Sequence, residues 1–187
     1  MTLVVEPKTE QTEEVGVYQG ATIATSNIEV IQELEKIVGR PIPLLPVNHW
    51  RTFSFEVFEK HVIKLAIHKM NLTNLPESIG KLHSLQELYL GHNKLTQLPE
   101  TLGNLHHLRV LILDHNEIAG VPDTLGNLHK LHTLDLSNNK LITLPIGFYT
   151  MKSLRMVDIA GNPHMRIPTI VERWLVRLRQ IGGTIFR

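Results

Sequence analysis

Histidine is the residue type in this chain whose number and spacing most clearly invite chemistry. Eleven of the 187 residues are histidines, and five of them recur at an interval of 23 residues, as the sets His83, His106, His129 and His92, His115. If that interval is a structural repeat, the members of a set stack on successive turns, where neighbouring imidazoles can share a Zn, Cu or Ni ion. Three nearly collinear imidazoles make poor tetrahedral geometry, however, and protonated ones repel each other below about pH 6. We therefore predict no metal site, and we keep a metal-binding protein that uses histidine ladders as a remote alternative.

Acid–base and nucleophilic groups are present but poorly arranged for catalysis. His107 with Asp114, or His132 with Asp135, offers a base and a carboxylate to orient it, but neither pair has a nucleophile at a persuasive spacing. The sequence contains no nucleotide-binding loop and no HExxH or GxSxG motif. It also contains no cysteine, which excludes a cysteine nucleophile, a disulfide scaffold and a Cys-based zinc site. We expect a protein that is not an enzyme and has no cofactor.

Composition points to one ordinary domain. Apolar residues make up 42% of the chain, and 19 Lys and Arg against 18 Asp and Glu leave a net charge of +1. A near-neutral total gives no reason to expect a nucleic-acid partner. No apolar run approaches the roughly 20 residues of a membrane span, and the N-terminus lacks the pattern of a secretory signal. We therefore expect a cytoplasmic protein without membrane insertion.

The leucines reveal the repeat. Of 28 leucines, 22 lie between Leu65 and Leu154, and the sequence matches itself at a period of 23. The copies that begin at Pro76 read PESIGKLHSLQELYLGHNKLTQL, PETLGNLHHLRVLILDHNEIAGV and PDTLGNLHKLHTLDLSNNKLITL, followed by the degenerate PIGFYTMKSLRMVDIAGNPHMRI. An earlier, weaker copy has Met70 at the asparagine position. We expect the recurring asparagines to turn inward and bond backbone groups of neighbouring turns; they are Asn93, Asn116, Asn139 and Asn162.

These copies resemble leucine-rich repeats of the 23-residue LPxxIGxLxxLxxLxLxxNxL kind. Repeats of that form occur in Ras-suppressor-like proteins, plant intracellular Ras-group-related proteins and many prokaryotic proteins. The resemblance implies an α/β right-handed solenoid with a short curved parallel sheet on its concave side. It also implies a protein-interaction role, with a small Ras-like GTPase as one type of partner.

The chain divides into four parts under this interpretation. Residues 1–25 are expected to be mobile, although Val15–Thr25 contains possible strand material. Residues 26–60 form an N-terminal helix–hairpin cap, in which Ser26 and Glu29 read as a capping box and Trp50 is a candidate anchor. Residues 61–168 hold five repeats, and residues 169–187 form a C-terminal cap helix and tail. A solenoid needs such caps because its end repeats would otherwise expose apolar faces.

The outward positions of the repeat strands are the candidate binding site. Tyr89, Val110 and Ile112 make an apolar cluster in the middle repeats, which the fold itself does not require. Asp114, Asp135 and Asp158 form an acidic edge beside it. The complete predicted concave site is Glu87, Tyr89, Val110, Ile112, Asp114, Asp135, Met156, Asp158, His92 and His115. An alternative explanation is that β-branched residues simply suit strands.

We therefore predict a non-catalytic adaptor that binds a protein partner on its concave face. A monomer is expected. The alternative is a structural or self-associating protein in which an exposed edge or a cap makes a homodimer.

Overall fold

The computed structural model describes residues 13–47 and 51–187, so Trp50 and the first twelve residues lie outside the described part of the chain. Two ordered units precede the repeats. Strands β1 (Val15–Tyr18) and β2 (Ala21–Ala24) form an antiparallel hairpin that runs directly into helix α1 (Thr25–Val38). Strands β3 (Phe53–Phe58) and β4 (His61–Ile67) form a second hairpin, whose turn residues Glu59 and Lys60 have positive φ.

The first hairpin corrects the expectation of mobility for residues 15–25 and agrees with the possible strand material expected there. Residues 15–24 are paired along their whole length, and Ile23 and Ala24 are buried. The capping box is also wrong, because Ala24 is the N-cap residue and makes no side-chain cap bond. Strand pairing supplies the backbone partners there instead: the Thr25 amide donates to the Glu14 carbonyl and the Ala24 amide donates to the Lys60 carbonyl, at 2.9 and 2.8 Å.

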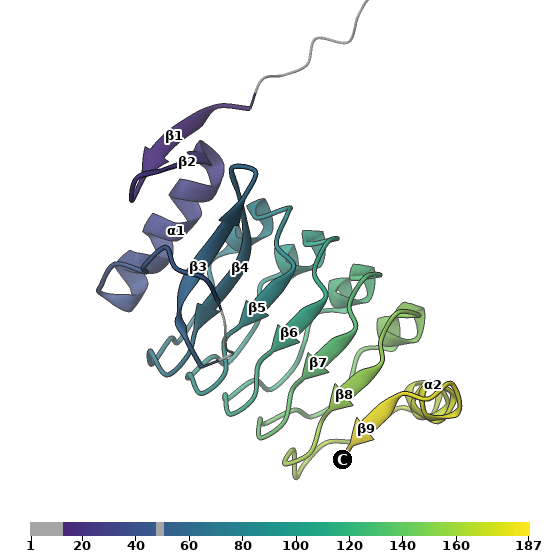
Figure 1. Ribbon diagram of the computed structural model, residues 1–187. Coiled ribbons are helices and arrows are strands. Elements are labelled where there is room, and N and C mark those ends of the chain that lie inside the picture. The colour runs from purple at the N-terminus through teal and green to yellow at the C-terminus, as the bar shows by residue number, and fades with distance from the viewer. Residues whose placement is uncertain (1–12, 48–50) are drawn as a thin grey trace, which may run out of the picture.

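Four short parallel strands continue the sheet from β4, one in each 23-residue copy (Figure 1). They are β5 (Glu87–Tyr89), β6 (Val110–Ile112), β7 (Thr133–Asp135) and β8 (Met156–Asp158). Their register is constant, since each residue pairs with the residue 23 positions later. Between strands, each copy returns through a short 3₁₀ helix: η1 (Glu77–Lys81), η2 (Glu100–Asn104), η3 (Asp123–Asn127) and η4 (Ile146–Thr150).

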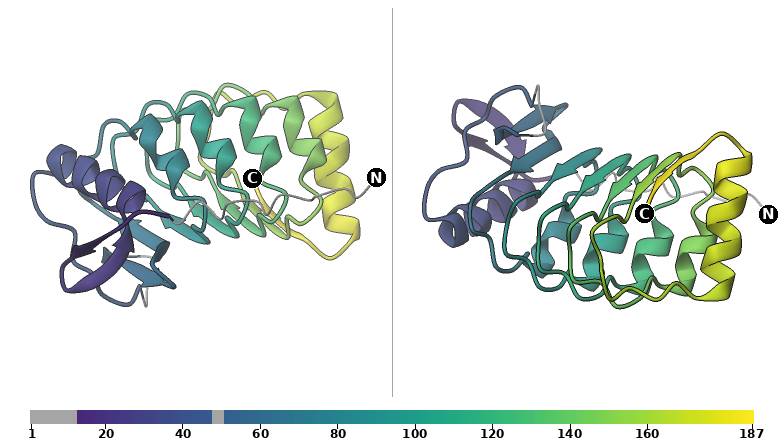
Figure 2. Two further views of the ribbon diagram at one scale, coloured as in Figure 1. Left: turned by 90° about the horizontal axis from the view of Figure 1, so that it is seen from above. Right: turned by 90° about the horizontal axis from the view of Figure 1, so that it is seen from below.

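Strands and 3₁₀ helices form two opposite walls of the solenoid (Figure 2). Each strand turns its central residue inward, and these residues are fully buried: Leu65, Leu88, Leu111, Leu134 and Val157. The 3₁₀ helices stack closely because glycines lie at the contacts between them. A Cβ added to Gly103 would lie 2.4 Å from the Thr124 carbonyl oxygen. One continuous apolar core therefore runs between the two walls.

The recurring asparagines lie buried at the turn after each strand. Asn116 is typical: its Oδ1 accepts from the Leu95 amide, and its Nδ2 donates to the Leu90 and Leu113 carbonyls, all at 3.0 Å. Asn93 makes the same bonds one repeat earlier, and Asn139 and Asn162 make them one and two repeats later. Each side chain thus joins its own turn to the preceding one.

The two ends of the sheet differ. At the N-terminal end β3 is the edge strand, and Asn27 of α1 accepts a buried hydrogen bond from the Val62 amide at 2.9 Å. At the C-terminal end α2 (Thr169–Gln180) packs on η4, with Trp174 edge-on to Phe148 at 6.0 Å. The chain then returns as β9 (Thr184–Phe186), which pairs in parallel with β8.

Candidate functional site on the concave face

The concave face is the solvent-facing side of strands β4 to β8. The period of 23 places equivalent side chains beside each other, so Glu87 neighbours Val110 and Tyr89 neighbours Ile112. One strand further, Ile112 neighbours Asp135, and Asp135 neighbours Asp158. The structure therefore brings the predicted apolar and acidic residues together in two rows across the sheet.

Tyr89 and Ile112 line a hollow in the middle of this face. Asp114 and Asp135 complete its wall, and its volume is about 170 Å³. Val110 and Ile112 are both half-buried rather than covered, and Met156, two repeats further along, is 43% exposed. The hollow combines an apolar floor with two carboxylates, which suits a partner that presents an apolar side chain close to a positive charge.

A hydrogen bond and an ion pair hold the side chains on the Tyr89 side of the hollow. The Tyr89 hydroxyl donates to Glu87 Oε2 at 2.6 Å, and Glu87 also lies 3.8 Å from Lys64 Nζ. Burial, followed by the bond to Glu87, raises the pKa of Tyr89 well above its ordinary value. The phenol therefore stays neutral and its ring is held in one orientation, ready to pack against an apolar group.

The acidic residues differ in their surroundings. Asp135 Oδ1 accepts from the Ser137 amide at 2.9 Å, and Asp158 Oδ1 accepts from the Ala160 amide at 3.0 Å. Burial raises the pKa of Asp135 against the lowering effect of Ser137, and the charges of Asp114 and Asp158 add to the increase. These two carboxylates keep part of their surface open on the concave face.

Asp114 is not an exposed member of the acidic edge, because it is 93% buried. Its Oδ2 lies 3.0 Å from His115 Nδ1 and 3.4 Å from His92 Nε2. The suggested pairing of Asp114 with His107 is wrong as well, since His107 Nδ1 lies 3.0 Å from the His83 carbonyl oxygen instead. The carboxylate thus belongs both to the hollow and to a cluster of histidines beyond the strands.

Three imidazoles pack in series at that position. The His92 and His115 rings are stacked, with centroids 4.1 Å apart and planes 7° from parallel, and the buried His68 ring meets His92 edge-on at 4.9 Å. Burial lowers the pKa of His68, and burial followed by the neighbouring His115 lowers the pKa of His92. Both side chains are therefore held toward their neutral forms.

Comparison with known sequences and structures identifies the repeat. A family profile described as leucine rich repeat matches residues 60–118, and one described as leucine rich repeats in two copies matches residues 106–147. The solved structure of a leucine-rich repeat protein of Leptospira interrogans is 34% identical, with a TM-score of 0.54, over 62% of this chain and 28% of that one. This chain is a leucine-rich repeat protein.

Two leucine-rich repeat neighbours were solved with bound partners. PEPR1–AtPEP1 is 32% identical over 57% of this chain and 16% of that one, with a TM-score of 0.50. The plant peptide hormone receptor RGFR1 in complex with RGF2 is 28% identical over 60% and 18%, with a TM-score of 0.51. This leucine-rich repeat chain thus spans 16 to 28% of the length of the three neighbours named. A search of the curated proteins found no match. Among the described residues, no helix is long and apolar enough to cross a membrane.

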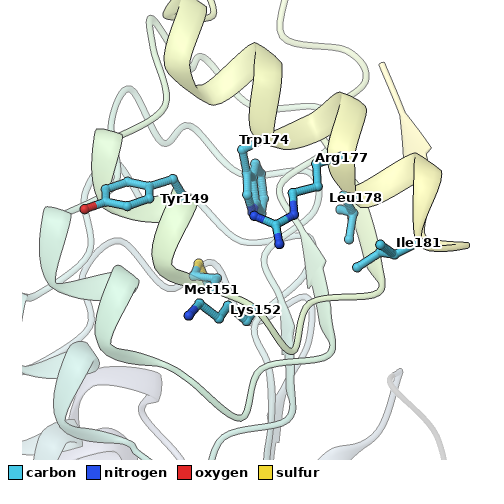
Figure 3. Close-up of a pocket in the computed structure, with 7 residues that line it drawn as sticks. All are labelled: Tyr149, Met151, Lys152, Trp174, Arg177, Leu178 and Ile181. Atoms are coloured by element: carbon cyan, nitrogen blue, oxygen red, sulfur yellow. The ribbon is translucent and has the colours of Figure 1, made fainter.

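A second hollow lies at the C-terminal end of the leucine-rich repeat solenoid, between η4 and α2. Its volume is about 140 Å³, and Figure 3 shows the Trp174 ring and the Arg177 side chain beside each other on one side, with Tyr149 across from them. Tyr149 and Ile181 are exposed there, at 53% and 56%. This surface is a candidate for contact between copies of the chain, and it is separate from the concave face.

Sequence reasoning missed two contributors to these sites. The interval of 23 places His68 in one row with Gly91 and Asp114, but it does not show that the His68 ring packs against His92 in the next row. Asn27 was read only as part of a helix, yet its buried amide serves the first repeat strand. No local pattern in the sequence distinguishes Asn27.

Proposed function

We propose that this leucine-rich repeat protein is a non-catalytic interaction module that binds a protein partner on its concave face. The observation that carries the proposal is the hollow lined by Tyr89, Ile112, Asp114 and Asp135. An apolar floor at the centre of an exposed sheet, with carboxylates at its rim, has the composition of a protein-binding centre. The bound partners in the structures of PEPR1 and RGFR1 lend support from the same repeat family.

The partner is expected to present an apolar side chain next to Lys or Arg. Ile112 would form the floor of the contact, while Asp135 and Asp158 would attract the cation and steer the approach. Tyr89 would contribute a large, already oriented ring, so little side-chain entropy would be lost on binding. A cytoplasmic location, expected from the sequence, and a role in small-GTPase signalling, implied by the family resemblance, are further parts of this proposal.

The test compares two isoleucine substitutions. Ile112→Asp puts a charge on the floor of the hollow, whereas Ile146→Asp puts the same charge on an exposed residue at the start of η4, on the opposite wall. Proteins captured from lysate of the source cells by the wild-type chain, and by each variant, are identified by mass spectrometry, and binding is then measured by calorimetry with the purified partner. We expect Ile112→Asp to weaken binding at least tenfold, a loss of about 1.4 kcal/mol or more, and Ile146→Asp to bind like wild type.

Two outcomes would contradict the proposal. One is a partner that Ile112→Asp retains with unchanged affinity. The other is a partner that Ile146→Asp loses as completely, which would place the contact elsewhere or indicate a general loss of structure. Circular dichroism of both variants shows whether the solenoid remains folded.

Self-association is the second candidate, and the exposed apolar side chains around α2 favour it. Tyr149, Val176 and Ile181 are each more than half exposed. Sedimentation velocity over a range of protein concentrations tests this directly. A mass that rises with concentration in wild type, and not in Ile181→Asp, would support a homodimer through this end, and a constant monomer mass would exclude it.

A further inference from the structure

The histidine cluster beyond strands β5 and β6 has the donor set of a metal site. His92 and His115 each follow their strand by three residues, and Asp114 lies between their ring nitrogens. One donor atom from each of the three residues falls within 4.8 Å of the other two. Two imidazoles and one carboxylate are a ligand set that proteins use for zinc and for other first-row transition metals.

The backbone holds the two histidines in a conformation that non-glycine residues rarely adopt. His92 and His115 have φ values of 55° and 52°, in the left-handed region. Backbone hydrogen bonds fix both turns, because the His92 amide donates to the Asp114 carbonyl at 2.8 Å and the His115 amide donates to the Ser137 carbonyl at 2.9 Å. The two rings are therefore set side by side by the repeat itself and not by flexible loops.

Two of the three distances between donor atoms match edges of a coordination polyhedron, and the third pair, the two ring nitrogens, lies within 4.8 Å. With metal–ligand bonds of about 2.1 Å, adjacent donors lie about 3.0 Å apart in an octahedron and about 3.4 Å apart in a tetrahedron. Asp114 Oδ2 lies 3.0 Å from His115 Nδ1 and 3.4 Å from His92 Nε2. The planes of the His92 and His115 rings are 7° from parallel, so one ring must turn before both nitrogens point at one ion. His115 has room to rotate because its side chain is 49% exposed.

Asp114 provides a second observation, because it is a buried carboxylate that its described neighbours compensate only in part. The side chain is nine-tenths buried, and its Oδ1 has no hydrogen-bond partner among the described residues. Gly91 makes room for this carboxylate, since a Cβ at that position would lie 2.2 Å from Asp114 Oδ1. A buried carboxylate without full compensation is costly, and a bound divalent ion would repay that cost.

The site is open on one side and supported on the other. An exposed hollow of about 310 Å³ leads to it, lined by His92, His115, Lys69 and Lys94 among others. The buried ring of His68 backs His92 and limits its movement. Solvent can therefore supply the remaining ligands, and the two lysines would favour an anion among them.

We propose that His92, Asp114 and His115 form a binding site for one divalent transition-metal ion, with zinc as the reference ion. The other histidine ladder differs, because His83, His106 and His129 are exposed and no described carboxylate forms an ion pair with them. This inference does not rest on the proposed function, because it concerns the isolated chain and the metal alone.

The neighbouring repeat supplies variants that should keep the fold. Asn138 occupies the histidine position with φ 54°, and Ser137 occupies the position of Asp114. His92→Asn, His115→Asn and Asp114→Ser therefore remove one ligand each and copy a residue that the solenoid already accepts. His129→Asn, in the other ladder, is the matched control. All chains are prepared without a histidine tag and freed of metal with a chelator.

ZnCl₂ is titrated into each chain by calorimetry, and CoCl₂ is followed by its visible absorption, which reports the coordination geometry. We expect one Zn²⁺ per wild-type chain, the same affinity in His129→Asn, and a loss of more than about tenfold in each of the three ligand variants. The proposal is overturned if wild type binds neither ion below about 1 mM. It is equally overturned if the ligand variants, shown by urea unfolding to be folded, bind like wild type, or if His129→Asn weakens binding as much as they do.

Discussion

Replacing Asn116 by alanine tests whether the buried asparagines hold the solenoid together. The substitution removes three hydrogen bonds of 3.0 Å, one accepted from the Leu95 amide and two donated to the Leu90 and Leu113 carbonyls. Asn116 is 6% exposed, so water cannot easily replace the lost amide. The backbone groups of two successive repeats would be left without their partner.

The expected cost follows from these bonds. A hydrogen bond contributes about 1 kcal/mol net, so three bonds predict a loss of about 3 kcal/mol in the free energy of unfolding. With a urea m-value of about 2 kcal/mol/M, the unfolding midpoint would fall by about 1.5 M. The stranded amide and carbonyl groups make this a lower estimate, because an unsatisfied buried group costs more than the bond contributed.

Urea unfolding followed by far-ultraviolet circular dichroism measures the change, with Asn127→Ala as the control. Asn127 is exposed at the end of η3, so its substitution should shift the midpoint by less than about 0.3 M. An Asn116→Ala midpoint within that same range would refute the reasoning. It would mean that the turns are held by their leucines and that the amide bridges contribute nothing measurable.

Two further predictions concern packing and charge. Gly103→Ala should destabilise the protein by about 1–3 kcal/mol, because the new Cβ meets the Thr124 carbonyl. Gly120→Ala should be close to neutral, since nothing lies within 4 Å of a Cβ there. Thermal unfolding measures both variants, and equal melting temperatures would contradict the packing argument. Asp135→Asn should raise stability at pH 7. The folded carboxyl has a raised pKa, so the native state binds more protons than the unfolded chain between the two pKa values, and stability falls as pH rises through that window. The gain over wild type should shrink toward about pH 3.5, and a gain that does not depend on pH would exclude this cause.

The repeat interval alone was enough to predict which strand residues become neighbours. Tyr89, Ile112 and Asp135 fall in one row because each lies 23 residues after the last, and the observed register is the same. The leucine-rich repeat architecture and its parallel sheet are confirmed for this reason. A period in the sequence fixes a period in space whenever successive copies stack without slipping.

Contacts between different rows were beyond such reasoning. Asp114 was assigned to an exposed acidic edge, but the left-handed turn at His115 brings the next residue's ring back over its carboxylate. The predicted capping box at the start of α1 was wrong for a related reason. Ser26 and Glu29 form a familiar local pattern, yet the helix begins directly after β2 with Ala24 as its N-cap residue, and the Ala24 and Thr25 amides donate to the Lys60 and Glu14 carbonyls. In both cases a tertiary contact overrode a local signal.

The asparagine bridges give the solenoid a direction. The side-chain amide of each asparagine bonds the preceding turn through the same atoms, so every junction between internal repeats is held by the same set of hydrogen bonds. Removing or duplicating a segment of one full period would join the repeats through the same hydrogen bonds and change only the breadth of the concave face, by about 4.8 Å for each strand. Adding or removing a single residue would instead turn leucines outward in the altered copy. The number of repeats can therefore change in whole units. Such a change alters the breadth of the concave face and leaves the contacts between repeats as they are.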